Sequence, residues 1–418
     1  MSRHRIAAGV LLAILSACGG ERIGEKSAVT ERDSAGVHIV EVDLASVVFP
    51  GGWRISEPAV VRLGSVADEA SEALFRIVDA FRLADGRIVV ANGGSQELRF
   101  YDGRGELLTA VGGEGDGPGE FRRLTWMGRA GDDSIAAFDY RARRMTVLDS
   151  AGGISRTFQL ESFPDPLAGE PSRFRAPRVI GRLGNGEFLI AAMPTASTGG
   201  SYEGVPEDSV TYYAYTSAGS PVGAVATQPA NESWVRSTDR QVTMMPVPFG
   251  RSTHAAVGPE GFWLGSSDSP DIRSYDARGG LRLILRRLEP VRPVGQADVS
   301  RYKQRKIDEA SEYPEWQEEL TKLLDRVPFG RTVPTFASFL VDDLGYVWVE
   351  RYATDEATEA ESSLWTVFRP DGRPAALLRM PPGVRPLHVG RRYIVALHVD
   401  DLEIEHVEAY LLERSPPD

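Results

Sequence analysis

The chain is poor in metal-binding and disulfide-forming residues. Only one cysteine, Cys18, occurs among its 418 residues, so an intrachain disulfide and a cysteine-based zinc site are both excluded. The six histidines are scattered, and of these we place only His254 on an expected inner strand, so a histidine metal cluster is not expected. We predict no metal and no other cofactor.

Positive charge and long apolar runs are also scarce. Lysine and arginine number 47 against 59 acidic residues, which gives a net charge of −12. Such a surface repels phosphate backbones, so we expect no nucleic-acid partner. The apolar run from Ile6 to Ala17 is too short to span a bilayer. Glycine and proline, at 43 and 27 residues, are abundant enough for a fold built largely of turns.

The N-terminal segment is typical of a secretory signal. Arg3 and Arg5 precede the apolar run, which has the length of a signal-peptide core. The sequence Leu15-Ser16-Ala17-Cys18 resembles the bacterial lipobox, in which the signal is cut before a cysteine that receives a lipid. The resemblance implies a signal peptide over residues 1–17 and lipidation of Cys18.

The segment after Cys18 is rich in charged and small residues. We expect residues 18–35 to form a tether between lipid and folded domain. Gly19 follows the cysteine where an aspartate would signal retention elsewhere, so resemblance to Gram-negative sorting implies the outer membrane, facing the periplasm. The alternative for Cys18 is an unmodified, buried cysteine.

A phrase of strands and turns recurs along the chain. Its clearest copy has an apolar strand, the turn Asp85-Gly86, a β-branched strand from Ile88 to Asn92, and then the turn Tyr101-Asp102-Gly103. The phrase predicts four short antiparallel strands joined by hairpins. Units of this kind, about 40 to 50 residues long, are typical of β-propeller blades, because one blade buries both faces only when neighbours stack on it.

The first turn of the phrase gives the number of blades. It occurs six times, at residues 85–86, 131–133, 184–186, 259–261, 343–345 and 390–392. A β-branched or aromatic strand follows each copy directly. We therefore predict an all-β fold, a six-bladed β-propeller over residues 36–414, with five or seven blades as less favoured counts.

The last predicted blade lacks chain for its outer strand. After His406 to Leu412 only a polar tail remains, whereas Val60 to Gly64 has the pattern of an outer strand and precedes the first complete blade. Pairing these two segments would close the ring and remove an open sheet edge. Gly36 to Val42 is a candidate for a further strand of the same closure.

Two segments resemble bacterial six-bladed β-propeller proteins related to NHL repeats. Gly112 to Phe121 is similar to the linker between an outer strand and the next inner strand, and Val333 to Val349 to the strand-turn-strand phrase. The resemblance extends over most of residues 36–412. It implies binding or scaffolding more often than catalysis, and a fold by itself does not decide function.

All long insertions are of two kinds that propeller connectivity places on one face. They are second-to-third-strand loops or linkers between blades, at residues 113–120, 194–209, 228–249, 289–329 and 352–363. We call this face the loop-rich face and the opposite one the turn face. Functional residues concentrate on such loops.

The longest insertion has a helical pattern. Residues 296–328, between the fourth and fifth predicted blades, carry spaced apolar residues among dense charges, and Pro314 divides them into two pieces. A helical lid over the channel mouth and a helical pair packed on a blade flank are both compatible with this pattern.

An arginine stands at the entry of each predicted innermost strand. The pattern is clearest in two near-identical segments that read Val-Pro-Phe-Gly-Arg, at 247–251 and 327–331. The six arginines are Arg76, Arg122, Arg175, Arg251, Arg331 and Arg385. Pointing inward, they would ring the channel mouth and bind a carboxylate or phosphate. In the alternative, they pair with acidic loop residues and the phenylalanines wedge between blades.

Signals of catalysis are weak. Six-bladed lactonases hold a metal in the channel with carboxylates and an amide; no matching set is recognisable here, although Asp79 and Asn92 are candidates to lie near the channel. The glycine-rich segment 113–119 has the composition of an anion-binding nest. It lacks the lysine and hydroxyl residue of a P-loop, and we interpret it as a linker.

These observations predict a monomeric propeller in the cell envelope, anchored to the membrane by a lipid on Cys18. Its loop-rich face and channel mouth are expected to bind an unidentified protein or an anionic small molecule. The alternative is a hydrolase or lyase that uses the same channel.

Overall fold

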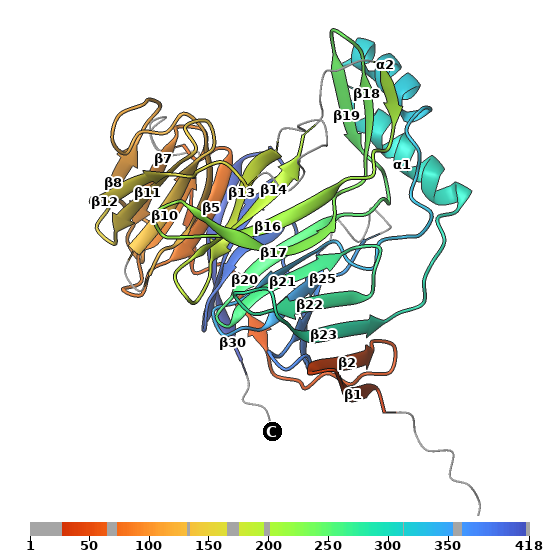
Figure 1. Ribbon diagram of the computed structural model, residues 1–418, viewed down its shortest axis with the longest axis horizontal. Coiled ribbons are helices and arrows are strands. Elements are labelled where there is room, and N and C mark those ends of the chain that lie inside the picture. The colour runs from red at the N-terminus through yellow and green to blue at the C-terminus, as the bar shows by residue number, and fades with distance from the viewer. Residues whose placement is uncertain are drawn as a thin grey trace, which may run out of the picture.

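A computed structural model describes residues 27–64, 73–131, 134–164, 175–195, 201–311, 313–353 and 362–414. The predicted signal peptide 1–17 and Cys18 lie outside these ranges. The fold is all-β with two helices (Figure 1). The described strands form six sheets of four to six strands and one three-stranded sheet.

Three sheets come from the first half of the chain, each in antiparallel order. The first contains β5 (Ile77–Arg82), β6 (Ile88–Asn92), β7 (Glu97–Tyr101) and β8 (Leu107–Gly112). The second contains β9 (Leu124–Arg129), β10 (Ser134–Asp139), β11 (Arg144–Asp149) and β12 (Ile154–Gln159). The third contains β13 (Arg175–Arg182), β14 (Phe188–Pro194), β16 (Ser209–Tyr215) and β17 (Pro221–Pro229).

Three further sheets follow, two of them extended by N-terminal strands. The fourth contains β20 (Thr253–Gly258), β21 (Gly261–Ser266), β22 (Asp271–Tyr275), β23 (Leu281–Leu288), β2 (Val37–Asp43) and β1 (Val29–Ser34). The fifth contains β24 (Ser338–Val341), β25 (Val347–Glu350), β26 (Leu364–Phe368) and β27 (Pro374–Arg379). The sixth contains β28 (Val384–Val389), β29 (Tyr393–Val399) and β30 (Glu405–Glu413), with β3 (Arg54–Ile55) and β4 (Val61–Leu63) paired to β30.

The recurring Asp-x-x-Gly phrase forms a specific turn. Asp102 Oδ1 accepts hydrogen bonds from the backbone N–H groups of Arg104 (2.8 Å) and Glu106 (2.9 Å), and Gly105 between them has a φ of 97°. Asp276 and Asp342 make the same pair of bonds in their own turns. A left-handed φ favours glycine and the carboxylate satisfies the turn's N–H groups, so this short phrase fixes a hairpin locally.

The six sheets pack against one another in sequence. Each of six buried apolar clusters joins two consecutive sheets, and the last joins the sixth sheet to the first. First strands also touch: β5 contacts β9, β9 contacts β13, β13 contacts β20, β20 contacts β24, and β28 contacts β5. The core therefore lies between the sheets, and the first strands gather around a common centre.

The two ends of the domain meet in the sixth sheet. Strand β4 pairs antiparallel with β30, with Leu63 opposite Val407, and Leu63 is 2 % exposed. This confirms the predicted pairing of the early strand with the last one. Because the paired strands are far apart in the chain, the pairing ties the N-terminal part of the domain to the C-terminal part and covers the edge of β30.

The prediction for Gly36 to Val42 was wrong. Strand β2 does not join the terminal sheet but pairs in parallel with β23 of the fourth sheet, with His38 opposite Leu283. Strand β1 then pairs with β2, so residues 29–34, expected in the tether, belong to the sheet. Val40 and Val42 are fully buried between the fourth and fifth sheets. This burial favours pairing of β2 with β23 over pairing with the edge of another sheet.

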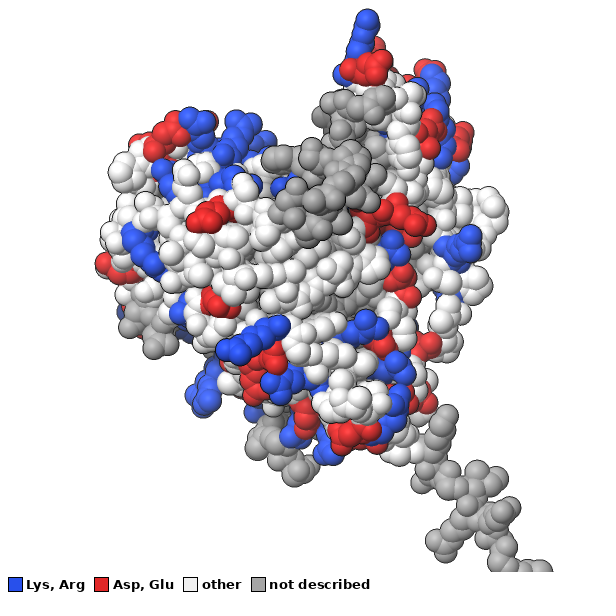
Figure 2. Space-filling model, in the orientation of Figure 1, with Lys and Arg blue, Asp and Glu red and all other residues white. Residues whose placement is uncertain are grey.

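The two helices lie between β23 and β24. Helix α1 (Gln296–Glu309) and helix α2 (Pro314–Leu324) project with the small sheet of β15 (Tyr202–Gly204), β18 (Ser233–Ser237) and β19 (Val242–Pro246) (Figure 1). Leu323 of α2 packs against Trp234 of β18, and Leu320 and Leu324 pack near Met245 of β19. Figure 2 shows charges of both signs on this projection. The helices therefore pack mainly on this three-stranded sheet.

The two Val-Pro-Phe-Gly segments contact each other directly. The Gly330 N–H donates to the Pro248 carbonyl (2.8 Å), and Phe249 and Phe329 both lie against Tyr302 of α1, with ring centroids 6.0 and 5.7 Å away. A side chain at Gly330 would collide with the Phe249 carbonyl, which explains the glycine. The near-identical segments thus form the base on which α1 rests.

Candidate functional site

A cavity of about 490 Å³ lies where the first strands gather. We call it the central cavity. Its lining includes the starts of β20, β24 and β28 and the ends of β14 and β25. In each sheet, the first strand begins and the second strand ends toward the loop-rich face. The cavity is therefore displaced toward that face.

Asp79 and Arg385 lie on adjoining first strands, β5 and β28, and both line the cavity. Burial raises the pKa of Asp79 to about 7. The Ala80 N–H, which donates to Asp79 Oδ1 (2.8 Å), and the charge of Arg385 act in the opposite direction and lower the pKa. A carboxyl group with this pKa exchanges its proton near neutral pH. Arg385 is exposed and lines the cavity, and among the described residues its guanidinium group has no hydrogen bond or ion pair; its electrostatic interaction is with Asp79.

A second group surrounds Arg178 of β13. Arg178 is also exposed and also lacks an ion pair within the described ranges. Beside it, burial and then the Arg178 charge lower the pKa of His254 to about 4, so this imidazole is neutral at pH 7. Burial raises the pKa of Tyr212 to about 12, and Gln228 Nε2 donates to its hydroxyl (2.6 Å).

The His254 ring packs against two phenylalanine rings. Its ring lies 5.5 Å from the Phe336 ring and 6.1 Å from the Phe339 ring, measured between centroids. Its Nε2 has no hydrogen-bond partner in the described part of the chain. An unsatisfied buried nitrogen is costly unless a ligand or water completes it. The neutral imidazole is therefore a candidate hydrogen-bonding group for a cavity ligand.

The charged groups that line the cavity are of both signs. Glu350 lines it too, and Ser338 Oγ donates to its Oε2 (2.6 Å). The cationic groups come from the third and sixth sheets and the acidic ones from the first and fifth. The cavity thus offers two guanidinium groups, each flanked by polar side chains, to a small molecule.

The six arginines predicted at strand entries lie in different environments. Arg385 lines the central cavity. Arg251 is held by Glu232 (3.7 Å) and Asp268 (3.3 Å), and its Nε donates to the Ala230 carbonyl (3.0 Å). Arg251 therefore follows the alternative prediction, in which the arginines pair with acidic loop residues.

Arg122 and Arg175 are engaged in a similar way. Arg122 forms an ion pair with Asp116 of the preceding linker, and Arg175 donates to the Ser209 carbonyl (2.9 Å) with Asp208 at 3.9 Å. Arg76 and Arg331 are exposed, and neither has an ion pair within the described residues. The structure thus brings Arg385 together with Arg178, a residue that the strand-entry pattern did not single out.

Two other sequence candidates have local structural contacts. Asn92 is fully buried at the end of β6, where its Oδ1 accepts from the Phe75 N–H (3.1 Å) and its Nδ2 donates to Ser95 Oγ (3.0 Å). In the glycine-rich linker, the Gly117 N–H donates to Glu120 Oε2 (2.7 Å). Both sets of contacts stabilise the segment that enters a sheet. The Gly117 N–H is bound to Glu120, a carboxylate of the protein itself, and is not free for an external anion.

Side chains close the opposite end of the first strands. Arg129 Nη2 donates to the Arg82 carbonyl (2.6 Å), the Tyr393 hydroxyl donates to the same oxygen (3.1 Å), and His388 Nε2 lies 2.9 Å from Asp343 Oδ1. These groups come from different sheets. Contacts between them place a polar layer at the turn face, so the cavity opens toward the loop-rich face.

Among the described residues, no three histidine, cysteine or acidic side chains are grouped so that they could hold a metal ion. In the same ranges, neither helix is both long enough and apolar enough to cross a membrane.

Neither a known protein family nor a curated protein matches the sequence. Solved structures do resemble the fold. A putative exported protein from Bacteroides fragilis is 11% identical, with a TM-score of 0.47, over 90% of this chain and 100% of that one. Virginiamycin B lyase from Staphylococcus aureus is 12% identical, with a TM-score of 0.39, over 87% and 100%. At such values the similarity says nothing about function.

Proposed function

We propose that the protein is a lipid-anchored β-propeller of the cell envelope that binds an anionic small molecule in its central cavity. In this proposal the six large sheets are six blades of one ring, and the helices form an insertion between the fourth and fifth blades. The lipobox-like sequence at Cys18 supports anchoring, at the outer membrane and facing the periplasm.

The observation that carries the binding proposal is the pair Arg178 and Arg385. Both guanidinium groups face one cavity from different sheets, and neither is neutralised by a carboxylate in an ion pair within the described residues. Arginine stays charged at any physiological pH and binds carboxylate or phosphate in bidentate fashion. A ligand with such a group would supply the missing counter-charge.

We expect the double variant Arg178→Gln/Arg385→Gln to lose this binding. Acetate, succinate and inorganic phosphate are suitable probes, with Cys18→Ser present to prevent lipidation. A probe at about 100 times its Kd should stabilise the unsubstituted cavity by about 2.7 kcal/mol. Each guanidinium removed should weaken binding about tenfold, the effect of losing one charge-assisted hydrogen bond. Calorimetric titration measures the affinity, and urea unfolding with and without the probe measures the stabilisation.

The matched control is Arg182→Gln, on the same strand as Arg178 but at its other end. It removes the same single charge as Arg178→Gln alone, with which it is compared, and should leave the affinity unchanged. Equal weakening by Arg182→Gln would show that the probes respond only to overall charge. An unchanged affinity in the double variant would refute the proposed site.

A hydrolase or lyase that uses the same cavity is a second candidate. The observation that favours it is Asp79, a carboxyl group able to take up and release a proton near neutral pH beside a fixed positive charge. General acid–base catalysis needs such a group. Turnover that depends on Asp79 would favour an enzyme, whereas binding that survives Asp79→Asn with no turnover would favour a binding module.

Asp79 also predicts how stability depends on pH. Its folded pKa of about 7 lies above the ordinary value of 3.8, so the folded state binds more protons between these values. Its contribution to stability is therefore present at low pH and is lost as pH rises toward 7. Asp79→Asn should remove this loss. Urea unfolding of both proteins at about pH 5 and about pH 8 measures it, and parallel pH profiles would contradict the assignment.

A further inference from the structure

Arg178 and Arg385 reach the central cavity from opposite sides. Arg178 is part of β13 in the third sheet, and Arg385 is part of β28 in the sixth. The six sheets pack in sequence and the sixth packs against the first, so two sheets separate the third from the sixth in either direction. The two guanidinium groups therefore meet different parts of a ligand that lies across the cavity.

The charges of the two arginines act on different neighbours. Burial is the main cause of the shifted pKa values in the cavity, lowering that of His254 and raising those of Tyr212 and Asp79. The Arg178 charge acts on the first two of these groups, and the Arg385 charge acts on Asp79. None of the three responds to both arginines. The two cations thus lie apart, as their mutual repulsion favours.

An aliphatic layer lies beneath the charged one. Side chains two positions apart on a strand lie on the same face of the sheet. Three aliphatic residues of the cavity lining each follow, by two positions on a first strand, a polar residue that also lines it. These pairs are Arg178 and Ile180, Ser338 and Leu340, and Arg385 and Leu387. Because first strands run away from the loop-rich face, the polar layer forms the mouth of the cavity and the aliphatic layer its floor.

The acidic groups of the lining leave space for an anion beside Arg385. Glu350 lies on a second strand, one strand further from the centre than the arginines, and its Oε2 accepts from Ser338 Oγ (2.6 Å). Asp79 is mostly protonated below its pKa of about 7, which burial raises. A protonated carboxyl group donates a hydrogen bond to a carboxylate instead of repelling it.

We infer that the central cavity binds a linear dicarboxylate, with one carboxylate on Arg178, the other on Arg385 and the methylene chain on the aliphatic floor. This inference rests on the anion binding proposed above and narrows its ligand class. A single small carboxylate would leave one guanidinium group without a counter-charge and the floor in water. A dicarboxylate of the right length supplies both counter-charges and buries apolar surface.

The test is calorimetric titration of the Cys18→Ser chain with two matched series of probes, at about pH 6.5, where their carboxyl groups are ionised. Linear dicarboxylates from succinate to suberate are compared with monocarboxylates of the same carbon number, from butanoate to octanoate. We expect the dicarboxylate affinity to pass through a maximum with chain length. At that length it should exceed the affinity of the matched monocarboxylate about tenfold or more.

Single variants show whether each carboxylate has its own arginine. Arg178→Gln and Arg385→Gln should each remove the advantage of the dicarboxylate, because one guanidinium group remains to hold one carboxylate. Equal weakening of a dicarboxylate and its matched monocarboxylate in both variants would mean that the arginines hold one carboxylate together. That result would overturn the inference and leave the proposed function standing, whereas failure of every probe to bind would refute both.

The aliphatic floor has a test of its own. Galactarate has the carbon chain of adipate but carries hydroxyl groups on its four inner carbons. We expect it to bind more weakly than adipate, because hydroxyl groups placed on the floor lose water without gaining a hydrogen-bond partner. Tighter binding of galactarate than of adipate would contradict the apolar contact and overturn the inference.

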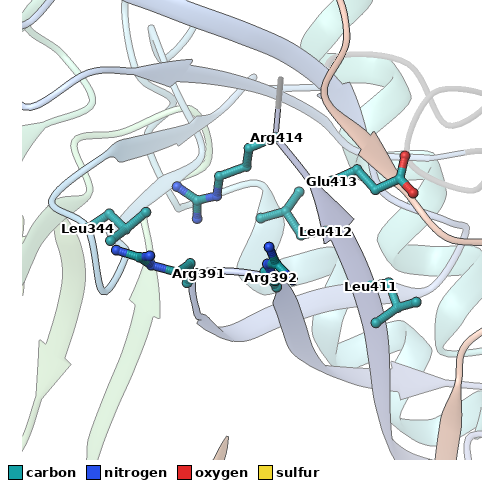
Figure 3. Close-up of a pocket in the computed structure, with 7 residues that line it drawn as sticks. All are labelled: Leu344, Arg391, Arg392, Leu411, Leu412, Glu413 and Arg414. Atoms are coloured by element: carbon teal, nitrogen blue, oxygen red, sulfur yellow. The ribbon is translucent and has the colours of Figure 1, made fainter. Parts of the chain in front are cut away.

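The control for charge is Arg391→Gln/Arg392→Gln, which removes as many charges as Arg178→Gln/Arg385→Gln. These two arginines are exposed at a pocket on the turn face, where the fifth and sixth sheets meet (Figure 3). Leu411 and Glu413 lie on the other face of β30 from them, and the pocket shares no residue with the central cavity. The control should change the affinity of either series by less than about twofold, because solvent screens distant charges. Loss of the dicarboxylate advantage in the control would also overturn the inference.

Discussion

Asp342→Ala is expected to lower the free energy of unfolding by about 3–5 kcal/mol, the usual cost of removing one partner of a buried ion pair. The Asp342 side chain is fully buried. Its Oδ2 accepts from Trp348 Nε1 (2.9 Å) and Arg414 Nη2 (2.8 Å), and its Oδ1 accepts from two backbone N–H groups of its turn. Alanine would leave a buried indole N–H without an acceptor and a buried guanidinium group without its carboxylate.

The matched control is Asp371→Ala. Asp371 lies within a comparable turn of the same sheet, which begins at Arg369. Its side chain is 45% exposed, its Oδ1 accepts from the Arg373 N–H (3.1 Å), and its Oδ2 lies 3.5 Å from Arg369 Nε. We expect it to change the unfolding free energy by only about 0.5 kcal/mol. Urea denaturation measures both variants. Equal effects would show that the turn, and not the buried pairing with Arg414 and Trp348, supplies the stability.

Leu63→Asp should also destabilise the domain strongly, by about 3 kcal/mol or more, because it places an unpaired carboxyl group in an apolar cluster. Leu63 of β4 packs in the cluster that joins the sixth sheet to the first, with Val395 and Leu397 of β29. The same cluster is where the two ends of the domain meet. Damage there should therefore affect the whole molecule.

Val60→Asp is the control for this prediction. Val60 is three residues away in the same segment, and its N–H donates to the Ala409 carbonyl (2.8 Å), but its side chain is 51% exposed. The variant adds the same charge and should have little effect on the urea midpoint. A Leu63→Asp protein as stable as Val60→Asp would mean that the terminal closure contributes little to stability.

Local structure could be read from the sequence because its causes are local. In the Asp102 and Asp276 turns, the carboxylate, the N–H groups that it accepts and the left-handed glycine lie within five consecutive residues. Such a turn needs no distant partner. The pairing of Val60 to Gly64 with the last strand was also predictable, since an incomplete last sheet needs a strand from elsewhere.

Strand β2 shows where this reasoning fails. Its alternating pattern predicts a strand, but the same pattern fits an edge of more than one sheet. Only the packing of Val40 and Val42 between the fourth and fifth sheets decides that β2 pairs with β23. That burial depends on surfaces made by residues more than two hundred positions away.

The candidate site also has features that are visible in the sequence and features that only the fold sets. Asp79 stands out in the sequence as a carboxylate within an apolar inner strand, and the arginine at each strand entry is a repeated feature, whereas no sequence pattern marks Arg178. Which guanidinium groups remain unpaired depends on the acidic groups that the fold brings near them. Arg251 lies beside Glu232 and Asp268, whereas Arg178 and Arg385 face the central cavity.

The sequence by itself determined the all-β class, the positions of the turns and the need for a strand from the other end of the chain, because these follow from spacing and local backbone chemistry. The tertiary structure alone decided the partner of β2, the support of the helices by the three-stranded sheet, and which arginines lie beside acidic groups. Those features depend on burial and on charge pairing between distant segments, which no local pattern encodes.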